Sequence, residues 1–232
     1  MTLSHHPSDA TLAAFAAGTL DEGRMLVVAA HLAACPSCRR AVRLLELTGG
    51  VLLDDVAPAE IAAGGLDRVL ARLDAPEAVP ASAPVRRQPV DTAERPADGG
   101  AAADIRGLLP AHARLLAGYE LGPWRWVGPG VWWRQVDAPT LPGGRVFLLK
   151  AAAGTTLPDH THTGTELTCV LTGAFRHEHG RFGPGDVDEA DDEVDHSPVV
   201  EPGVECVCLV AMQGRLRLNG LIGRVLQPFV RL

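Results

Sequence analysis

The sequence predicts a multidomain chain of mixed α and β structure, with a small helical bundle first and an all-β barrel or sandwich second. Apolar residues recur at helical spacing over roughly the first seventy residues. Short β-type runs, separated by turns rich in Gly and Pro, fill the C-terminal part. A Pro-rich segment without aromatic residues lies between them. We therefore expect a helical domain over residues 1–75, a linker over 76–105 and a β-domain over 106–232.

The helical part begins with three expected helices whose ends are marked by particular residues. The first follows Ser8 and stops at Gly18, since glycine adopts the backbone conformation of a helix C-terminal cap. Thr19 is followed three residues later by a glutamate, which is the spacing of a capping box, so we expect Thr19 to begin the second helix. Proline is tolerated in the first turn of a helix, so the third is expected to begin at Pro36.

The second expected helix is apolar on nearly every side. It carries Met25, Leu26, Val27 and Val28 in succession, with two alanines after them. A surface helix of a small bundle normally buries one apolar stripe and leaves a polar face to water. We therefore expect these four residues to need cover from outside the small helical domain.

Three metal-ligating side chains lie within eight residues, His31, Cys35 and Cys38. His31 and Cys35 are four apart, so they share a face of one helix, and the turn after Cys35 can bring Cys38 to the same point. A structural zinc needs four protein ligands, and the tandem His5-His6 is the natural source of the fourth. The alternatives are two small buried thiols or a redox pair, but a redox pair is expected in a βαβ context.

A second group of ligating residues lies in the β-domain. His160 and His162 are two apart on an expected strand, so they project from the same face and can share one metal ion. Glu166 adds a carboxylate, and His196 offers a third imidazole after a long acidic turn. Three imidazoles and one carboxylate suit a divalent transition metal.

Two further pairs in the β-domain repeat the same alternation. His177 and His179 are expected to be exposed strand residues rather than ligands, because the four-ligand set is complete without them. Cys206 and Cys208 share one face of another strand, and we expect them to be buried apolar thiols.

Composition excludes several classes of function. The formal net charge is −7, and Lys and Arg form only short pairs, which disfavours direct binding to nucleic acid. No stretch approaches the length of a membrane-spanning apolar helix, and the N-terminus does not resemble a signal peptide. Five cysteines, two of them in the metal cluster, fit a reducing compartment, so we expect a cytoplasmic protein without membrane contact.

The histidines of the β-domain stand in a spacing that resembles the first motif of the cupin superfamily, Gly154-x5-His160-x-His162-x3-Glu166-x6-Gly173. The resemblance implies a double-stranded β-barrel, or jelly roll, that binds a metal. The second cupin motif is only partly kept. His196 holds the histidine position, but Asp191 and Glu193 stand where Pro and Gly are usual, and Val200 replaces Asn. Metal binding is therefore expected, whereas the changed turn disfavours the geometry needed for catalysis.

The whole chain resembles the ChrR-type zinc anti-sigma factors, in which a His-x3-Cys-x2-Cys helical module precedes a cupin domain. The resemblance implies a regulatory protein without catalytic residues that binds and inhibits an extracytoplasmic-function (ECF) sigma factor. It implies Zn²⁺ held by His6, His31, Cys35 and Cys38, with His5 the alternative to His6. It also implies a divalent metal, Zn²⁺ or another transition metal, held by His160, His162, Glu166 and His196. The cupin domain would answer an oxidative-type signal, after which the sigma factor is released.

Under this resemblance, the apolar helix containing Met25, Leu26, Val27 and Val28 would complete its burial against the sigma factor. The competing hypothesis is a cupin-type metalloenzyme, a dioxygenase or isomerase, with an accessory zinc domain. The altered turn before His196 and the attached helical module disfavour it.

Overall fold

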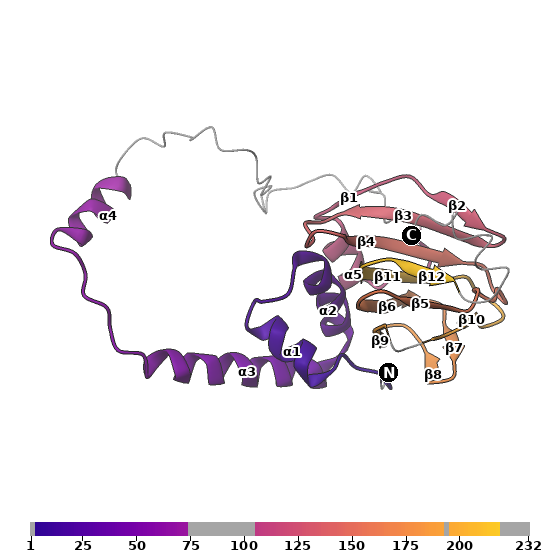
Figure 1. Ribbon diagram of the computed structural model, residues 1–232, viewed down its shortest axis with the longest axis horizontal. Helices are drawn as coiled ribbons and strands as arrows, with labels where there is room; N and C mark the ends of the chain where they lie inside the picture. Colours follow the sequence, from indigo (N-terminus) through magenta and orange to yellow (C-terminus); the bar gives the residue numbers. More distant parts are fainter. Residues whose placement is uncertain (1–2, 74–104, 193–194, 219–232) are drawn as a thin grey trace. The chain divides into compact units, whose positions relative to one another are not determined.

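Figure 1 shows the computed structural model, which describes residues 3–73, 105–192 and 195–218. Contacts divide the chain into two compact units, residues 1–47 together with 97–232, and residues 48–96. The first unit therefore joins the N-terminal helices to the β-domain. The predicted linker, residues 76–105, lies outside the described residues except at its last position, and the predicted domain boundaries stay a prediction.

Five helices are present among the described residues: α1 Asp9–Ala16, α2 Glu22–Ala34, α3 Pro36–Asp54, α4 Gly65–Leu73 and α5 Pro110–Leu116. The expected helix ends are confirmed at three points. The Ser8 hydroxyl caps α1 by accepting the Thr11 N–H, and Gly18 follows α1 with φ of +67°. Helix α3 begins at Pro36.

The predicted capping box is wrong. Asp21, not Thr19, caps α2, and its carboxylate accepts the backbone N–H and the side-chain Nε–H of Arg24. The Thr19 hydroxyl instead donates to the Ala14 carbonyl at the end of α1. An aspartate one residue before the helix satisfies the free N–H groups and also interacts favourably with the helix dipole, so it replaces the threonine.

The described part of the β-domain contains twelve strands in antiparallel sheets. The largest sheet has the order β1-β3-β4-β11-β6-β9 with β2 beside β3, and the smaller sheets are β10-β7-β8 and β12-β5. Isolated bridges pair Thr156 with Val199 of β10 and His160 of β5 with His196. The strands are β1 Glu120–Leu121, β2 Arg125–Gly128, β3 Val131–Asp137, β4 Gly144–Ala151, β5 His160–His162, β6 Glu166–Thr172, β7 Phe175–His177, β8 Gly180–Phe182, β9 Val187–Ala190, β10 Val199–Val200, β11 Cys206–Gln213 and β12 Leu216–Leu218.

Strand β11, in the middle of the large sheet, is buried on both faces, and its residues from Cys206 to Met212 are apolar without a break. Alternate residues of β11 enter two different cores, as the two-residue period of a strand requires. Val207, Leu209 and Ala211 pack toward the N-terminal helices. Cys206, Cys208, Val210 and Met212 pack toward the interior of the barrel.

Helix α2 lies against the outer face of this sheet and contacts β6, β11 and β4 (Figure 1). Leu26, Val27 and Val28 are at most 2% exposed, and Met25 is half-buried. The predicted cover from outside the helical bundle is thus provided by the chain's own barrel. The structure buries these residues against the chain's own barrel, and the partner-binding role predicted for Met25, Leu26, Val27 and Val28 stays a prediction.

Exposed apolar side chains gather instead on α3 and α4. Helix α4 buries none of its residues, although its sequence is strongly amphipathic. The exposed residues are Leu44, Leu47, Val51, Leu52 and Leu53 on α3, Val56 and Ile61 after it, and Leu66, Val69, Leu70 and Leu73 on α4. Exposed apolar side chains in this number make each of these helices a candidate interaction surface. Among the described residues, no helix is both long and apolar enough to span a membrane.

Candidate metal centres

The structure brings the four predicted N-terminal ligands together. His31 lies in the last turn of α2, Cys35 follows that helix, and Cys38 lies in the first turn of α3. His6 approaches from the segment before α1. Its Nδ1 lies 3.3 Å from His31 Nε2, and 3.4 Å from the Sγ atom of each cysteine.

These distances fit a tetrahedral zinc ion. With ordinary Zn–N and Zn–S bond lengths, ligand atoms lie about 3.3 Å apart for two nitrogens and about 3.6 Å apart for nitrogen and sulfur. His31 also donates its Nδ1–H to the Gly185 carbonyl, 2.7 Å away. This bond fixes the ring so that Nε2 faces the cluster, as is usual for a metal-bound histidine.

The choice between the tandem histidines follows from where each ring points. His5 turns away from the cluster and stacks on Phe182, with ring centroids 4.0 Å apart. His6 is exposed and directs Nδ1 at the two thiols. The structure therefore supports His6 over His5 as the fourth ligand.

The two thiols of the cluster differ in acidity. Burial acts to raise the pKa of Cys35, but hydrogen bonds from Ser37 and Cys38 outweigh it, so its pKa is lowered. Burial, together with the neighbouring Cys35, raises the pKa of Cys38 to about 11. Burial also lowers the pKa of His31, which keeps the imidazole neutral and able to ligate.

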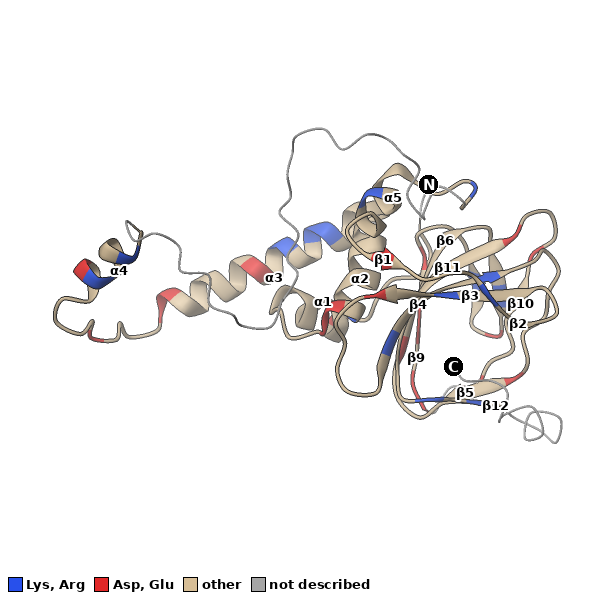
Figure 2. Ribbon diagram, turned by 90° about the horizontal axis from the view of Figure 1, so that it is seen from above, with Lys and Arg blue, Asp and Glu red and all other residues tan. Residues whose placement is uncertain are grey.

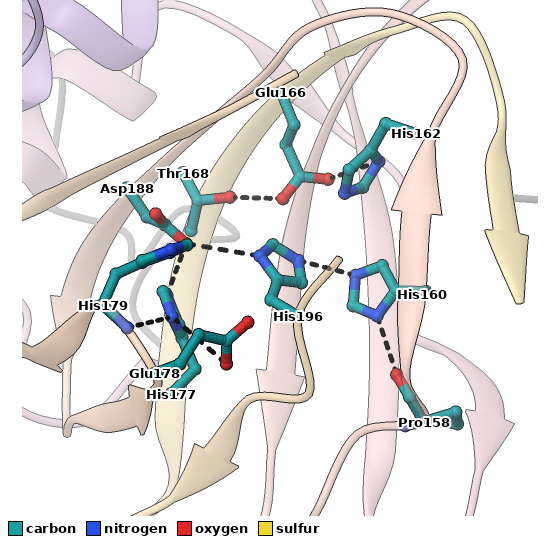
Figure 3. Close-up of polar contacts among 10 residues, drawn as sticks. All are labelled: Pro158, His160, His162, Glu166, Thr168, His177, Glu178, His179, Asp188 and His196. Carbon is teal, nitrogen blue, oxygen red and sulfur yellow. Dashed lines mark hydrogen bonds and ion pairs between the residues drawn. The ribbon is translucent and has the colours of Figure 1, made fainter. Parts of the chain in front are cut away.

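The barrel holds a second cluster, shown in Figure 3. His160 and His162 point inward from β5, and His196 lies opposite His160 across an antiparallel bridge. Their ligating nitrogens lie within 4.8 Å of one another, with His160 Nε2 and His196 Nε2 3.0 Å apart. All three side chains are buried, and burial lowers the pKa of each, so all three are neutral near pH 7.

The free nitrogens of these rings fit a metal ion at their centre. His160 donates Nδ1–H to the Pro158 carbonyl at 2.7 Å, which leaves its Nε2 as an acceptor. Neither nitrogen of His162 has a hydrogen-bond partner, although the residue is only 1% exposed. A buried imidazole without hydrogen bonds is costly, and a cation would satisfy it.

Glu166 lies beside this cluster at the start of β6. Its Oε2 is 3.5 Å from His162 Nδ1, and its Oε1 accepts the Thr168 hydroxyl at 3.0 Å (Figure 3). Burial raises the pKa of this carboxyl group. The predicted set of His160, His162, Glu166 and His196 is thus assembled at one place, with the carboxylate outside the tight group of three imidazoles.

A cavity of about 460 Å³ opens onto the barrel cluster. His160, His196 and Glu166 line it at one side. Most of the rest of its wall is apolar and includes Phe147, Leu149, Phe175, Val200 and Leu216. A molecule that entered this cavity would meet the metal site as its main polar feature.

Comparison with known proteins finds a matching family for each half of the chain. Residues 113–215 match the family described as ChrR cupin-like domain, and residues 9–39 match a putative zinc-finger family. The anti-sigma-E factor ChrR of Cereibacter sphaeroides is 42% identical over the full length of both chains. The crystal structure of Rhodobacter sphaeroides SigE in complex with the anti-sigma ChrR matches with a TM-score of 0.65 and 39% identity, covering 91% of this chain and all of that one.

The chain belongs to the ChrR family of anti-sigma factors. This confirms the predicted family, the helical module followed by a cupin fold, and a regulatory protein in place of the competing metalloenzyme. The match to a zinc-finger family agrees with zinc in the N-terminal part.

Within this ChrR-family fold, one of the two histidines expected to be exposed is buried. The His177 side chain has no exposed surface, and its Nε2 donates to Asp188 Oδ2 at 3.0 Å, whereas His179 is exposed. Asp188 was not singled out by sequence reasoning. The spacing of His177 and His179 predicts that they share a face but not which elements cover it, and the acidic run around Asp188 looks like any solvated turn.

Proposed function

We propose that the chain binds and inhibits an ECF-type sigma factor in the cytoplasm, and that its cupin domain controls release. The observation that carries this proposal is the full-length relationship to an anti-sigma factor, together with the structure of a relative bound to SigE. The candidate zinc cluster and the exposed apolar helices add support from the chain itself.

His6, Cys35 and Cys38 would hold the zinc ion together with His31. A zinc ion bound there supplies a rigid junction, and these residues join the segment before α1, the end of α2 and the start of α3. A bundle this small has little core of its own, so metal binding contributes directly to its folding. The direction in which α3 leaves the cluster is fixed by Cys38.

The surface proposed for the sigma factor consists of the exposed apolar residues of α3 and α4. Helix α2 is covered by the barrel, whereas Leu52 and Leu53 on α3 and Leu66 and Val69 on α4 are each more than half exposed. Helix-in-groove recognition uses apolar anchors of this kind. Figure 2 shows Lys and Arg at separate places along the described ribbon, several of them near the start of α3, with Asp and Glu elsewhere on the same helices and strands. The formal net charge of −7 favours a protein partner over nucleic acid.

His160, His162, Glu166 and His196 would hold a divalent metal in the barrel, which supplies a Lewis-acidic centre at the end of the cavity. The residues around it form an apolar chamber with few polar groups. An oxidative-type signal that changed this site would alter the affinity for sigma only by acting differently on the bound and free states.

The test is a binding assay between the purified full-length chain and ECF-type sigma factors, with transcription by RNA polymerase as readout. Cys38→Ser should abolish inhibition, because it removes a zinc ligand at the start of α3. Cys206→Ser is the matched control, since this thiol lies in the barrel wall, and it should keep inhibition. Inhibition that survives Cys38→Ser with the zinc lost would contradict the proposed role of the cluster.

A further inference from the structure

One strand contacts the surroundings of both candidate metal centres. Strand β9, with the two residues before it, lies at the end of the large sheet's order, next to β6. Consecutive residues of a strand point to opposite sides. Within β9, Glu189 lies on the side of the N-terminal module and Asp188 on the side of the barrel cavity, whereas Gly185 and Asp186 precede the strand.

On the N-terminal side, this segment holds the surroundings of the zinc cluster. The Gly185 carbonyl accepts His31 Nδ1–H, and Asp186 Oδ1 accepts the backbone N–H groups of Ser4 and His5, at 2.8 and 3.0 Å. The Val187 N–H donates to the His5 carbonyl at 3.3 Å. His5 is covalently joined to the candidate ligand His6.

Glu189 extends these contacts to α1. Its carboxylate accepts the Ser8 N–H and hydroxyl at 2.8 and 3.1 Å, and the Thr11 hydroxyl at 2.6 Å. Ser8 is the N-cap of α1, so the helix start is fixed to β9.

On the cavity side, Asp188 faces the imidazoles of the barrel. Its Oδ2 accepts His177 Nε2–H at 3.0 Å and lies 3.9 Å from His196 Nδ1 (Figure 3). His196 Nδ1 is buried and has no hydrogen-bond partner, while the Nε2 of the same ring points at His160. Asp188 also lies opposite Thr168 of the neighbouring strand β6. The Thr168 hydroxyl donates a hydrogen bond to Glu166.

We propose that Asp188 is a positioning residue for the barrel metal, and that β9 couples the two metal centres. With a metal on His196 Nε2, the proton resides on Nδ1 and Asp188 is the acceptor beside it. A carboxylate in this place fixes the orientation of the ligand ring and raises its basicity. A shift of Asp188 when the metal binds or leaves moves the backbone that holds His31, His5 and α1. This inference rests on the proposed function only in that both sites bind metal. It does not depend on binding of a sigma factor.

The experiment uses the full chain loaded with ¹¹³Cd²⁺, whose resonance separates a sulfur-ligated site from a site of nitrogen and oxygen. Zn²⁺ competition then gives the affinity of each site, and the alkylation rates of Cys35 and Cys38 report the N-terminal cluster. Asp188→Asn should lower the affinity of the barrel site about 10- to 100-fold, the usual loss for a residue that supports a metal ligand. It should also shift the barrel resonance and speed alkylation of Cys35 and Cys38 about fivefold or more.

Two neighbouring carboxylates serve as controls. Glu189→Gln lies one residue away on the opposite side of β9, so it should speed alkylation of the thiols but change the affinity of the barrel site far less than Asp188→Asn does. Glu201→Gln breaks an exposed ion pair with Arg181 and should change neither readout.

The metal-free forms of all variants should unfold at the same temperature, which separates positioning from general stability. If Asp188→Asn does not fold, Asp188→Glu replaces it and should show a displaced barrel resonance with a smaller loss of affinity. An unchanged barrel affinity in the Asp188 variant would overturn the positioning role. A lowered barrel affinity with unchanged thiol alkylation would overturn the coupling. Either result leaves sigma binding to be judged by its own assay.

Discussion

The two candidate metal centres differ in how the chain assembles them. The N-terminal cluster takes three of its four ligands from eight consecutive residues, and its fourth, His6, is exposed. The barrel cluster joins ligands from β5 and from a segment more than thirty residues later, and its three imidazoles are buried. We expect the first to need a metal ion to join the segment before α1 to α2 and α3, whereas the second lies inside a fold that has its own core. We therefore expect metal loss to unfold the first and to alter the second.

The largest expected effect tests the first half of this comparison. Cys35→Ser should remove one zinc per chain and unfold the N-terminal helices, because structural zinc binding contributes roughly 10 kcal/mol or more to such modules. Metal analysis and hydrogen exchange across α1 to α3 measure both consequences. A variant that lost its zinc but kept full protection from hydrogen exchange in these helices would contradict the claim that they need the metal to stay folded.

The next effect tests the second half. His160→Ala should lose the barrel metal while the protein stays folded, because the sheet around it is held by two apolar cores. We expect sigma inhibition to persist and the response to the inducing signal to weaken. Complete loss of sigma binding in this variant would contradict the proposal that the N-terminal cluster serves sigma binding and the barrel cluster serves the response to the signal.

The third effect in size is a loss of stability of the metal-free barrel at low pH. Burial lowers the pKa of His160 and His162, and burial with the neighbouring His160 lowers that of His196 to about 4. The fold favours the neutral imidazoles, so their contribution to stability is present above pH 6.5 and is lost as the pH falls toward 4. Urea unfolding of the metal-free protein at pH 7 and at pH 4.5 measures this loss. Equal stability at the two values would mean that the imidazoles are solvated.

The smallest expected effect concerns the contact between α2 and the β-domain. Tyr119 donates its hydroxyl to Glu22 at 3.0 Å, and burial together with Glu22 raises its pKa to about 12. Tyr119→Phe should cost about 0.5–1.5 kcal/mol, as expected for one hydrogen bond. The wild-type contribution should persist below pH 10 and fall as the pH rises toward 12, where the unfolded chain ionises first. Urea unfolding of both proteins at pH 8 and pH 11 tests this, and the difference should shrink at the higher pH.

The sequence predicted what depends on local spacing and missed what depends on packing between distant segments. Four-residue spacing on a helix brings His31 next to Cys35, and the alternation of a strand brings His160 next to His162. The choice of Asp21 over Thr19 as the α2 cap was missed, because both residues satisfy the rule and only the path of the chain separates them.

The same limit explains the two larger differences between the sequence predictions and the structure, which concern helix α2 and Asp188. Nothing local to Val27 shows that an apolar sheet face more than a hundred residues later will cover it. Nor does the sequence around Asp188 show that His177 and His196 will meet it inside the barrel. In both cases the sequence shows the chemistry of the side chain but not which distant residues it contacts in the fold.

The burial of α2 on the large sheet has a consequence for transplanting this module between proteins. Helices that carry Leu26, Val27 and Val28 on a face already fitted to one sheet are not interchangeable parts. A chimaera that joined them to another sensor domain would need a matching apolar outer face on that domain. Without one, the graft would present this face to water and to other copies of itself, and self-association would be expected to precede any test of regulation.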